Sequence, residues 1–259
     1  MKHLHAFLLP LLLSACSSGS TERVEEQETS TTIRSEEPTP LARWKDKGVD
    51  FVAQGQEPFW TVELDLDKGM HLFGPGVKFE MHTPIPEREE IPHGFRYHAE
   101  VESGKLTIEV IQQSCTDPMS GDAFPFSVRC LSNEQEFLGC GRFVADEEAL
   151  SGTWQLLRLD AQAIDPEMTD INLVFDLPNA RIYGSDGCNN YFGSAEISRD
   201  RLRLSSALGS TLKACEDMEM GLKFSEVLSS GSLRLQAGEG KLVLESDAHR
   251  LVFSRVVEE

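Results

Sequence analysis

Six cysteines carry the sharpest potential chemistry in this chain of 259 residues. A dithiol redox enzyme needs a Cys-x-x-Cys pair or a thiolate beside a cationic group, and a structural zinc site needs ligands at short, regular spacing. No two of these cysteines lie within five residues of each other; they are Cys16, Cys115, Cys130, Cys140, Cys188 and Cys215. The spacing argues against a redox pair or a zinc site and favours cysteines that are modified, bridged or buried.

The other reactive side chains do not form a recognisable catalytic group. Four histidines gather in the first half of the chain at a spacing that fits no known metal motif; they are His71, His82, His93 and His98. The Gly-x-Ser-x-Gly elbow of common esterases does not occur in the sequence. We therefore expect no catalytic residues, no metal ligands, no cofactor and no enzymatic activity, with a thiol-redox or hydrolytic enzyme as the remaining alternative.

Glu57 is the one carboxylate embedded among apolar neighbours, because Pro58, Phe59 and Trp60 follow it directly. One interpretation is a ligand or partner surface made by Glu57, Phe59 and Trp60. The other is a bend at Glu57 after which Phe59 and Trp60 pack into the core.

The first 15 residues have the pattern of a secretory signal. Lys2 precedes an apolar run, Ala6–Leu13, which is shorter than the roughly 20 residues that a membrane span needs. Leu13-Ser14-Ala15-Cys16 then resembles the lipobox of bacterial lipoproteins. The resemblance implies removal of residues 1–15, acylation of Cys16 with fatty acids such as palmitate, and a stable lipid anchor in the membrane. Ser17, which is not an aspartate, implies the outer membrane by that family's sorting rule, so we expect a bacterial envelope location facing the periplasm.

Residues 16–47 read as a disordered tether. They are rich in Ser, Thr and Glu, contain few large apolar residues and show no periodicity. The net charge of the whole chain is −19 at pH 7 and its pI is near 4.7. A polyanion repels phosphate backbones and anionic lipid, so we expect no nucleic-acid partner and no attachment through a basic patch.

Residues 48–144 alternate apolar and polar side chains with period two. The clearest runs are Trp60–Leu66, Val77–Met81, Phe95–Val101, Leu106–Val110 and Phe124–Cys130. Strict alternation with turn residues between the runs predicts half-buried antiparallel strands. This region is expected to be a small all-β domain of the barrel or sandwich kind.

Residues 148–259 predict a second antiparallel β-domain interrupted by one helix. Met220, Phe224, Val227 and Leu228 share a helical face, and acidic residues before it suit a helix N-terminus. Three signatures occur in order; they are Leu150–Leu156 (LSGTWQL), Gly187–Gly193 (GCNNYFG) and Ser210–Cys215 (STLKAC). On these residues the region resembles the META/HslJ-like domain of bacterial envelope proteins. The resemblance implies a barrel-like sheet with one helix, and a family linked to stress and envelope roles without an established catalytic activity.

The region before it is similar to an envelope family with a Gly-x-Glu-Pro-Phe-Trp start, here Gly55–Trp60 (GQEPFW). It shares the segments Cys115–Ser120 (CTDPMS) and Gly139-Cys140 with that family. The resemblance implies a Cys115–Cys140 disulfide. In an oxidising compartment we also expect a Cys188–Cys215 disulfide between the Gly-Cys-Asn turn and the helix, which adds ~3 kcal/mol in the loop-entropy model. Cys130 lies on an apolar stripe and is expected to be buried; a reactive thiol is the alternative.

Three functions compete. The first is a membrane-anchored, non-catalytic envelope module, carrying a META domain, that binds a protein partner or takes part in assembly or stress responses. The second is a carrier that holds a lipid or other apolar ligand inside one β-domain, since small barrels can enclose one small ligand. The third is a thiol-redox or hydrolytic enzyme.

Overall fold

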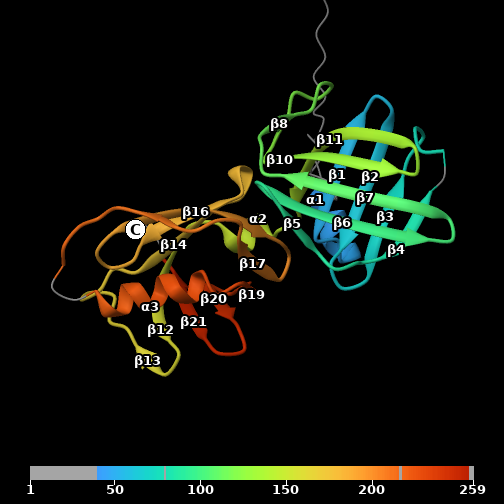
Figure 1. Ribbon diagram of the computed structural model, residues 1–259. Helices are drawn as coiled ribbons and strands as arrows, with labels where there is room; N and C mark the ends of the chain where they lie inside the picture. The colour runs from blue at the N-terminus through green and yellow to red at the C-terminus, as the bar shows by residue number, and fades with distance from the viewer. Residues whose placement is uncertain (1–39, 79, 216–217, 257–259) are drawn as a thin grey trace, which may run out of the picture. The chain divides into compact units, whose positions relative to one another are not determined.

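A computed structural model describes residues 40–78, 80–215 and 218–256, whose strands form two large sheets (Figure 1). The signal segment, Cys16 and most of the predicted tether lie outside the described residues. Over the part of the chain that is described, no helix has the length and hydropathy that a membrane crossing requires.

The predicted tether is wrong over its last eight residues, because Pro40–Lys47 form helix α1. Trp44 explains the helix: its ring packs against a small apolar cluster of Val49, Val52 and Val144. Its indole N–H also donates a hydrogen bond to Glu63 at 3.0 Å. One large aromatic side chain therefore docks a segment whose composition otherwise favours disorder.

The first sheet is antiparallel, has nine strands and is open at both edges, in the order β4-β3-β2-β1-β11-β10-β7-β6-β5. Its strands are β1 Phe51–Gln56, β2 Phe59–Asp65, β3 Gly69–Phe73, β4 Met81–Pro84, β5 Glu89–Ile91, β6 Gly94–Val101, β7 Gly104–Ile111, β10 Phe126–Ser132 and β11 Gln135–Phe143. A separate ribbon pairs β8 Cys115–Thr116 with β9 Ala123–Phe124. The period-two alternation is confirmed for Trp60–Leu66, Phe95–Val101 and Leu106–Val110, whose apolar residues mostly lie in one core. The strand predicted over Val77–Met81 is wrong, because β4 begins only at Met81 and Val77 and Lys78 lie outside any strand. The run Phe124–Cys130 is divided, because β9 ends at Phe124 and β10 begins at Phe126.

The second sheet closes into a barrel, because β12 pairs with β21 as well as with β14. Its strands are β12 Thr153–Leu159, β13 Gln162–Ala163, β14 Asn172–Asp176, β15 Arg181–Ser185, β16 Asn190–Ile197, β17 Arg201–Leu204, β18 Gly209–Ser210, β19 Ser232–Gly238, β20 Lys241–Glu245 and β21 Arg250–Arg255. The short helix α2 Glu147–Leu150 precedes it, the 3-10 turn η1 Leu177–Asn179 follows β14, and helix α3 spans Glu219–Leu228. The mainly β fold class and the single packed helix of this region are confirmed.

Aromatic side chains fill the interior of the second sheet. Trp154 is fully buried, and the ring of Phe224 on α3 meets Tyr191 at 5.6 Å and Phe253 at 6.3 Å, edge to face. The interior of this sheet is therefore filled by packed aromatic side chains of the protein itself.

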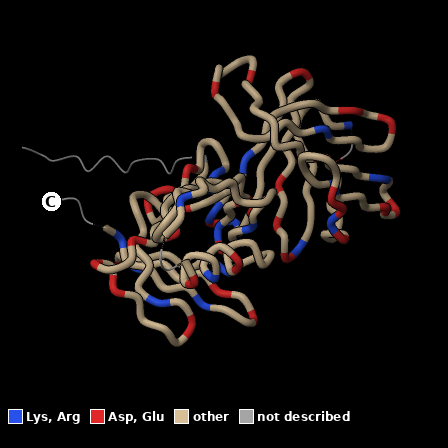
Figure 2. Tube along the Cα trace, turned by 60° about the vertical axis from the view of Figure 1, so that its left-hand side comes forward, with Lys and Arg blue, Asp and Glu red and all other residues tan. Residues whose placement is uncertain are grey.

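Ion pairs connect residues of the two sheets. The Arg88 guanidinium donates to both carboxylate oxygens of buried Glu196 at 2.6 and 2.7 Å and lies 3.8 Å from the centre of the Phe95 ring. Arg203 pairs with Glu90 at 2.8 Å. Elsewhere Asp and Glu are spread along the chain with Lys and Arg among them (Figure 2).

Candidate functional site

Trp60 sits in the core of the first sheet and does not contribute to a surface. It is 2 % exposed, packs on Phe137 with ring centres 5.8 Å apart, and donates from Nε1 to the Leu138 carbonyl at 3.3 Å. A Cβ on Gly55 would lie 2.2 Å from Trp60 Nε1, and one on Gly139 would lie 2.8 Å from Trp60 Cζ2. The indole needs both glycines, so the proposal of a ligand surface at Trp60 is wrong and the packing interpretation holds for this residue.

The loop between β7 and β10 is fastened to the outer face of the first sheet by two contacts. The predicted Cys115–Cys140 disulfide is present, with Cα atoms 5.4 Å apart. Asp117 is 1 % exposed and accepts hydrogen bonds from Gln56 Nε2 at 2.8 Å and from the N–H groups of Met119 and Ser120 at 2.9 Å. The Gln56 amide, followed by those backbone donors, lowers the pKa of the Asp117 carboxyl. Asp117 is thus a structural acceptor that shapes the loop.

Three exposed apolar side chains lie on the strands and the loop that these contacts join. Phe59 pairs across the hairpin with Gln56 and is 49 % exposed; continuing the Gln54–Cys140 register places Leu138 on the other side of Gln56. Met119 of the fastened loop and Leu138 are each 68 % exposed. We call Phe59, Met119 and Leu138 the Phe59 patch. Of the three residues first considered as a surface, Glu57 and Phe59 are exposed and Trp60 is not.

Cys130 is buried and has no disulfide partner among the described residues. Burial raises the pKa of its thiol to about 12. A thiol of that kind stays protonated at neutral pH and is a poor nucleophile, so the expectation of a small buried apolar residue is confirmed.

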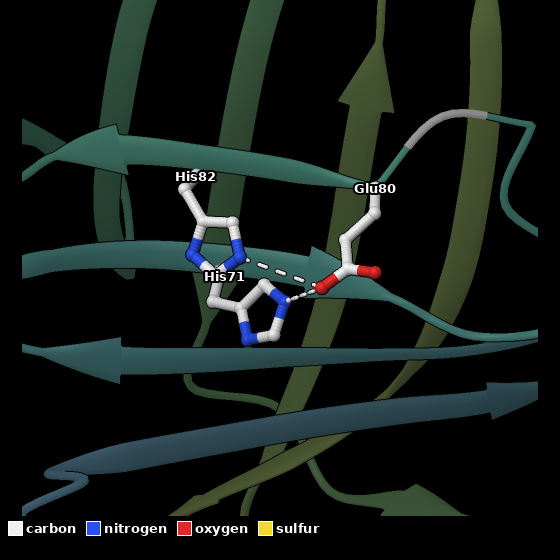
Figure 3. A group of neighbouring side chains, drawn as sticks. All are labelled: His71, Glu80 and His82. Atoms are coloured by element: carbon white, nitrogen blue, oxygen red, sulfur yellow. Dashed lines mark hydrogen bonds and ion pairs between the residues drawn. The ribbon is translucent and has the colours of Figure 1, made fainter.

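Two of the four histidines come together on the outer face of β3 and β4. His71 pairs with His82 across the two strands, and their rings stack with centres 3.8 Å apart (Figure 3). Glu80 Oε1 lies 2.7 Å from His71 Nε2 and 3.4 Å from His82 Nε2. His93 lies between β5 and β6 and His98 lies in β6, at the opposite end of the strand order from β3 and β4, so neither is part of this group. Linear spacing missed the group because cross-strand register, and not sequence distance, unites its members.

In the turn between β15 and β16 of the second sheet, the polar side chains and the cysteine also have structural roles. Asp186 Oδ1 accepts from the N–H groups of Cys188 at 2.9 Å and Asn189 at 2.6 Å. Asn189 is 4 % exposed, and its Oδ1 accepts from Thr211 Oγ1 at 3.0 Å and Lys213 N at 2.7 Å. The predicted Cys188–Cys215 disulfide is present, with Cα atoms 6.1 Å apart. The turn and the segment before α3 are therefore held together by one bridge and one buried amide.

Residues 147–258 match the family model described as META domain. Residues 147–258 form a META domain. A comparison with curated proteins gives no match. Among solved structures, one described as "NMR structure of the protein" is 18 % identical, with 42 % of this chain and 92 % of that chain covered and a TM-score of 0.36.

The META domain also contains a group of charged residues around the Asp160 carboxylate, which lies outside the three signatures. Asp160 follows β12 with a left-handed backbone, at φ 54°, and its carboxylate accepts from Arg250 N at 2.9 Å. Lys223 of α3 and His249 of the β20–β21 turn approach the other oxygen, each at 3.0 Å. The Arg250 N–H, followed by His249 and Lys223, lowers the pKa of Asp160 to about 2. This carboxylate connects the helix to two turns at one end of the barrel.

The Asp160→Asn variant should lose stability in a pH-dependent way. Because the folded pKa is near 2 and the usual value is 3.8, the ionised carboxylate stabilises the fold fully above pH 3.8, and its contribution disappears as the pH falls through 2. We expect the variant to melt about 2–4 °C lower than wild type at pH 7. That difference should shrink below pH 4, as followed by circular dichroism.

Asp247→Asn is the matched control, because it removes the same charge from an exposed position in the β20–β21 turn. An equal effect of both substitutions, or a constant difference between Asp160→Asn and wild type from pH 7 to pH 2, would contradict the role of Asp160.

Proposed function

We propose that this chain is a lipid-anchored lipoprotein of the bacterial envelope whose folded part binds a protein partner and catalyses no reaction. The proposal rests on the hydrogen bonds made by Asp117 and Asn189 of the signatures and by Asp186, which directly precedes one of them. Each accepts hydrogen bonds from backbone, hydroxyl or amide donors of the protein itself. Side chains so engaged hold loops in place and are not free to act on a substrate.

The anchor is supported by the Leu13–Cys16 lipobox pattern and by the acidic segment that follows it. An acyl anchor of several chains keeps a protein at a bilayer without a spanning helix. The outer membrane, facing the periplasm, is the proposed location because Ser17 follows the acylated cysteine.

The Phe59 patch is the proposed partner surface. Phe59, Met119 and Leu138 are each about half exposed or more, and they sit on a loop and two strands that a disulfide and Asp117 make rigid. A pre-organised apolar centre loses little conformational entropy on binding. With Glu57 beside it and a chain charge of −19, the patch suits a partner that offers apolar side chains rimmed by basic ones.

Replacing Cys16 tests the anchor. In the native host the wild-type chain should incorporate labelled palmitate and begin at an acylated Cys16, as seen by mass spectrometry of the N-terminal peptide. Cys16→Ser should incorporate none and keep residues 1–15, because serine has no thiol to acylate. Ser18→Ala serves as the control and should behave as wild type. An unmodified Cys16 or a retained leader in the wild-type chain would refute the anchor.

Replacing the patch tests the binding role. Crosslinking in cells followed by purification should recover a discrete partner with wild type and at least about tenfold less with the Phe59→Ser/Leu138→Ser variant, since two apolar contacts are lost. The control is Tyr183→Ser/Phe192→Ser, which removes an exposed cross-strand aromatic pair of the META domain. Undiminished recovery with the patch variant, or equal loss with the control, would rule out the Phe59 patch as the binding surface.

A further inference from the structure

We propose that His71, Glu80 and His82 form a binding site for a divalent transition-metal ion such as Zn²⁺. The ligand atoms of these three residues all lie within 4.8 Å of one another, close enough for one ion to touch all three (Figure 3). The proposal runs against the expectation from linear spacing, and it rests on positions that the strand register brings together.

The register places the ligands in a row across the sheet. Glu63 on β2 is paired with His71 on β3, which in turn is paired with His82 on β4. Paired residues of neighbouring antiparallel strands point to the same face, so the two imidazoles lie side by side there. Glu80 precedes His82 by two positions and reaches the same point from just outside β4.

The site is accessible from solvent. Strand β4 ends the sheet order, and the side chains of His82 and Glu80 are 69 % and 60 % exposed. An ion can therefore enter without any rearrangement of the fold. Protein ligands supply three positions, and water or a partner's side chain would complete the coordination, as in zinc sites with an open position.

His71 is the ligand whose orientation the structure fixes. Its ring stacks on Phe73, with ring centres 4.4 Å apart, and on His82, with ring centres 3.8 Å apart. Its Nδ1 faces Glu63 Oε2 at 3.9 Å, while Nε2 points to Glu80. Glu63 is in turn held by Trp44 at 3.0 Å and Lys47 at 3.2 Å. At 3.9 Å the Glu63 carboxylate is within ion-pairing distance of Nδ1 and makes no direct hydrogen bond to it; it lies where metal proteins place the carboxylate that orients a ligating histidine.

The donor set selects the class of metal. Two imidazole nitrogens and one carboxylate oxygen suit Zn²⁺, Cu²⁺, Ni²⁺ and Co²⁺, whereas Ca²⁺ and Mg²⁺ prefer oxygen ligands alone. The competing explanation is a surface cluster in which Glu80 only pairs with protonated histidines, and such pairs contribute little. The two explanations differ in one measurable property, which is stoichiometric metal uptake.

Calorimetric titration of the full chain with ZnCl₂ distinguishes them. The protein is purified in detergent by a tag without histidine, and every version carries His3→Asn and His5→Asn so that the leader cannot supply ligands. We expect one Zn²⁺ per chain and, with Co²⁺ as the probe, a visible absorption band. His82→Asn and Glu80→Gln should each weaken Zn²⁺ binding at least tenfold.

His98→Asn is the matched control, because His98 is an exposed histidine on β6 of the same sheet and bonds Thr107 at 2.8 Å. It should bind Zn²⁺ as the parent chain does. Circular dichroism checks that each variant is folded, which the exposure of His82 and Glu80 favours. Failure to bind one ion per chain, undiminished binding in His82→Asn, or an equal loss in His98→Asn would overturn the proposal.

Discussion

The packing of Trp60 against Gly55 and Gly139 is the contact on which the first sheet's outer surface depends. Trp60 belongs to β2, and its indole lies against Gly55 of the adjacent β1 and Gly139 of β11, two positions that have no side chain. A shift of one residue in any of these strands would bring a Cβ into the ring and would also turn every side chain to the opposite face. The contact therefore fixes which residues of these strands point outward.

Both surfaces with a proposed role follow from that fixed alignment. Phe59 and Leu138 flank Gln56 because β2, β1 and β11 keep their register, and Gln56 can then fasten the loop through Asp117. The same register, continued through β3 and β4, sets His71 beside His82. In the META domain the corresponding role belongs to buried Asn189 and the Cys188–Cys215 bridge, which hold the turn before β16 to the segment before α3.

The sequence predicted what depends on local pattern. Alternation such as that from Trp60 to Leu66 identified strands, because one face of each is buried. The Cys115–Cys140 disulfide and the META fold followed from family resemblances carried by short signatures. The Cys188–Cys215 disulfide was expected from its place between a turn and the helix in an oxidising compartment. Helix α1 was not predicted, because a single aromatic residue, Trp44, offsets a composition that otherwise favours disorder. The His71–Glu80–His82 group and the charged group around Asp160 were not predicted either. Strand register and barrel closure bring their members together, and no local sequence pattern encodes these.

Amide hydrogen exchange of a Gly139→Ala chain tests the dependence on Trp60 most directly. The added Cβ would lie 2.1 Å from the Gln54 carbonyl oxygen and 2.8 Å from the indole, whereas a Cβ on Gly238 would meet nothing within 4 Å. We expect at least tenfold faster exchange across β1, β2 and β11 in Gly139→Ala, unchanged exchange in β12–β21, and wild-type behaviour for Gly238→Ala. Wild-type protection of β1, β2 and β11 in Gly139→Ala would contradict it.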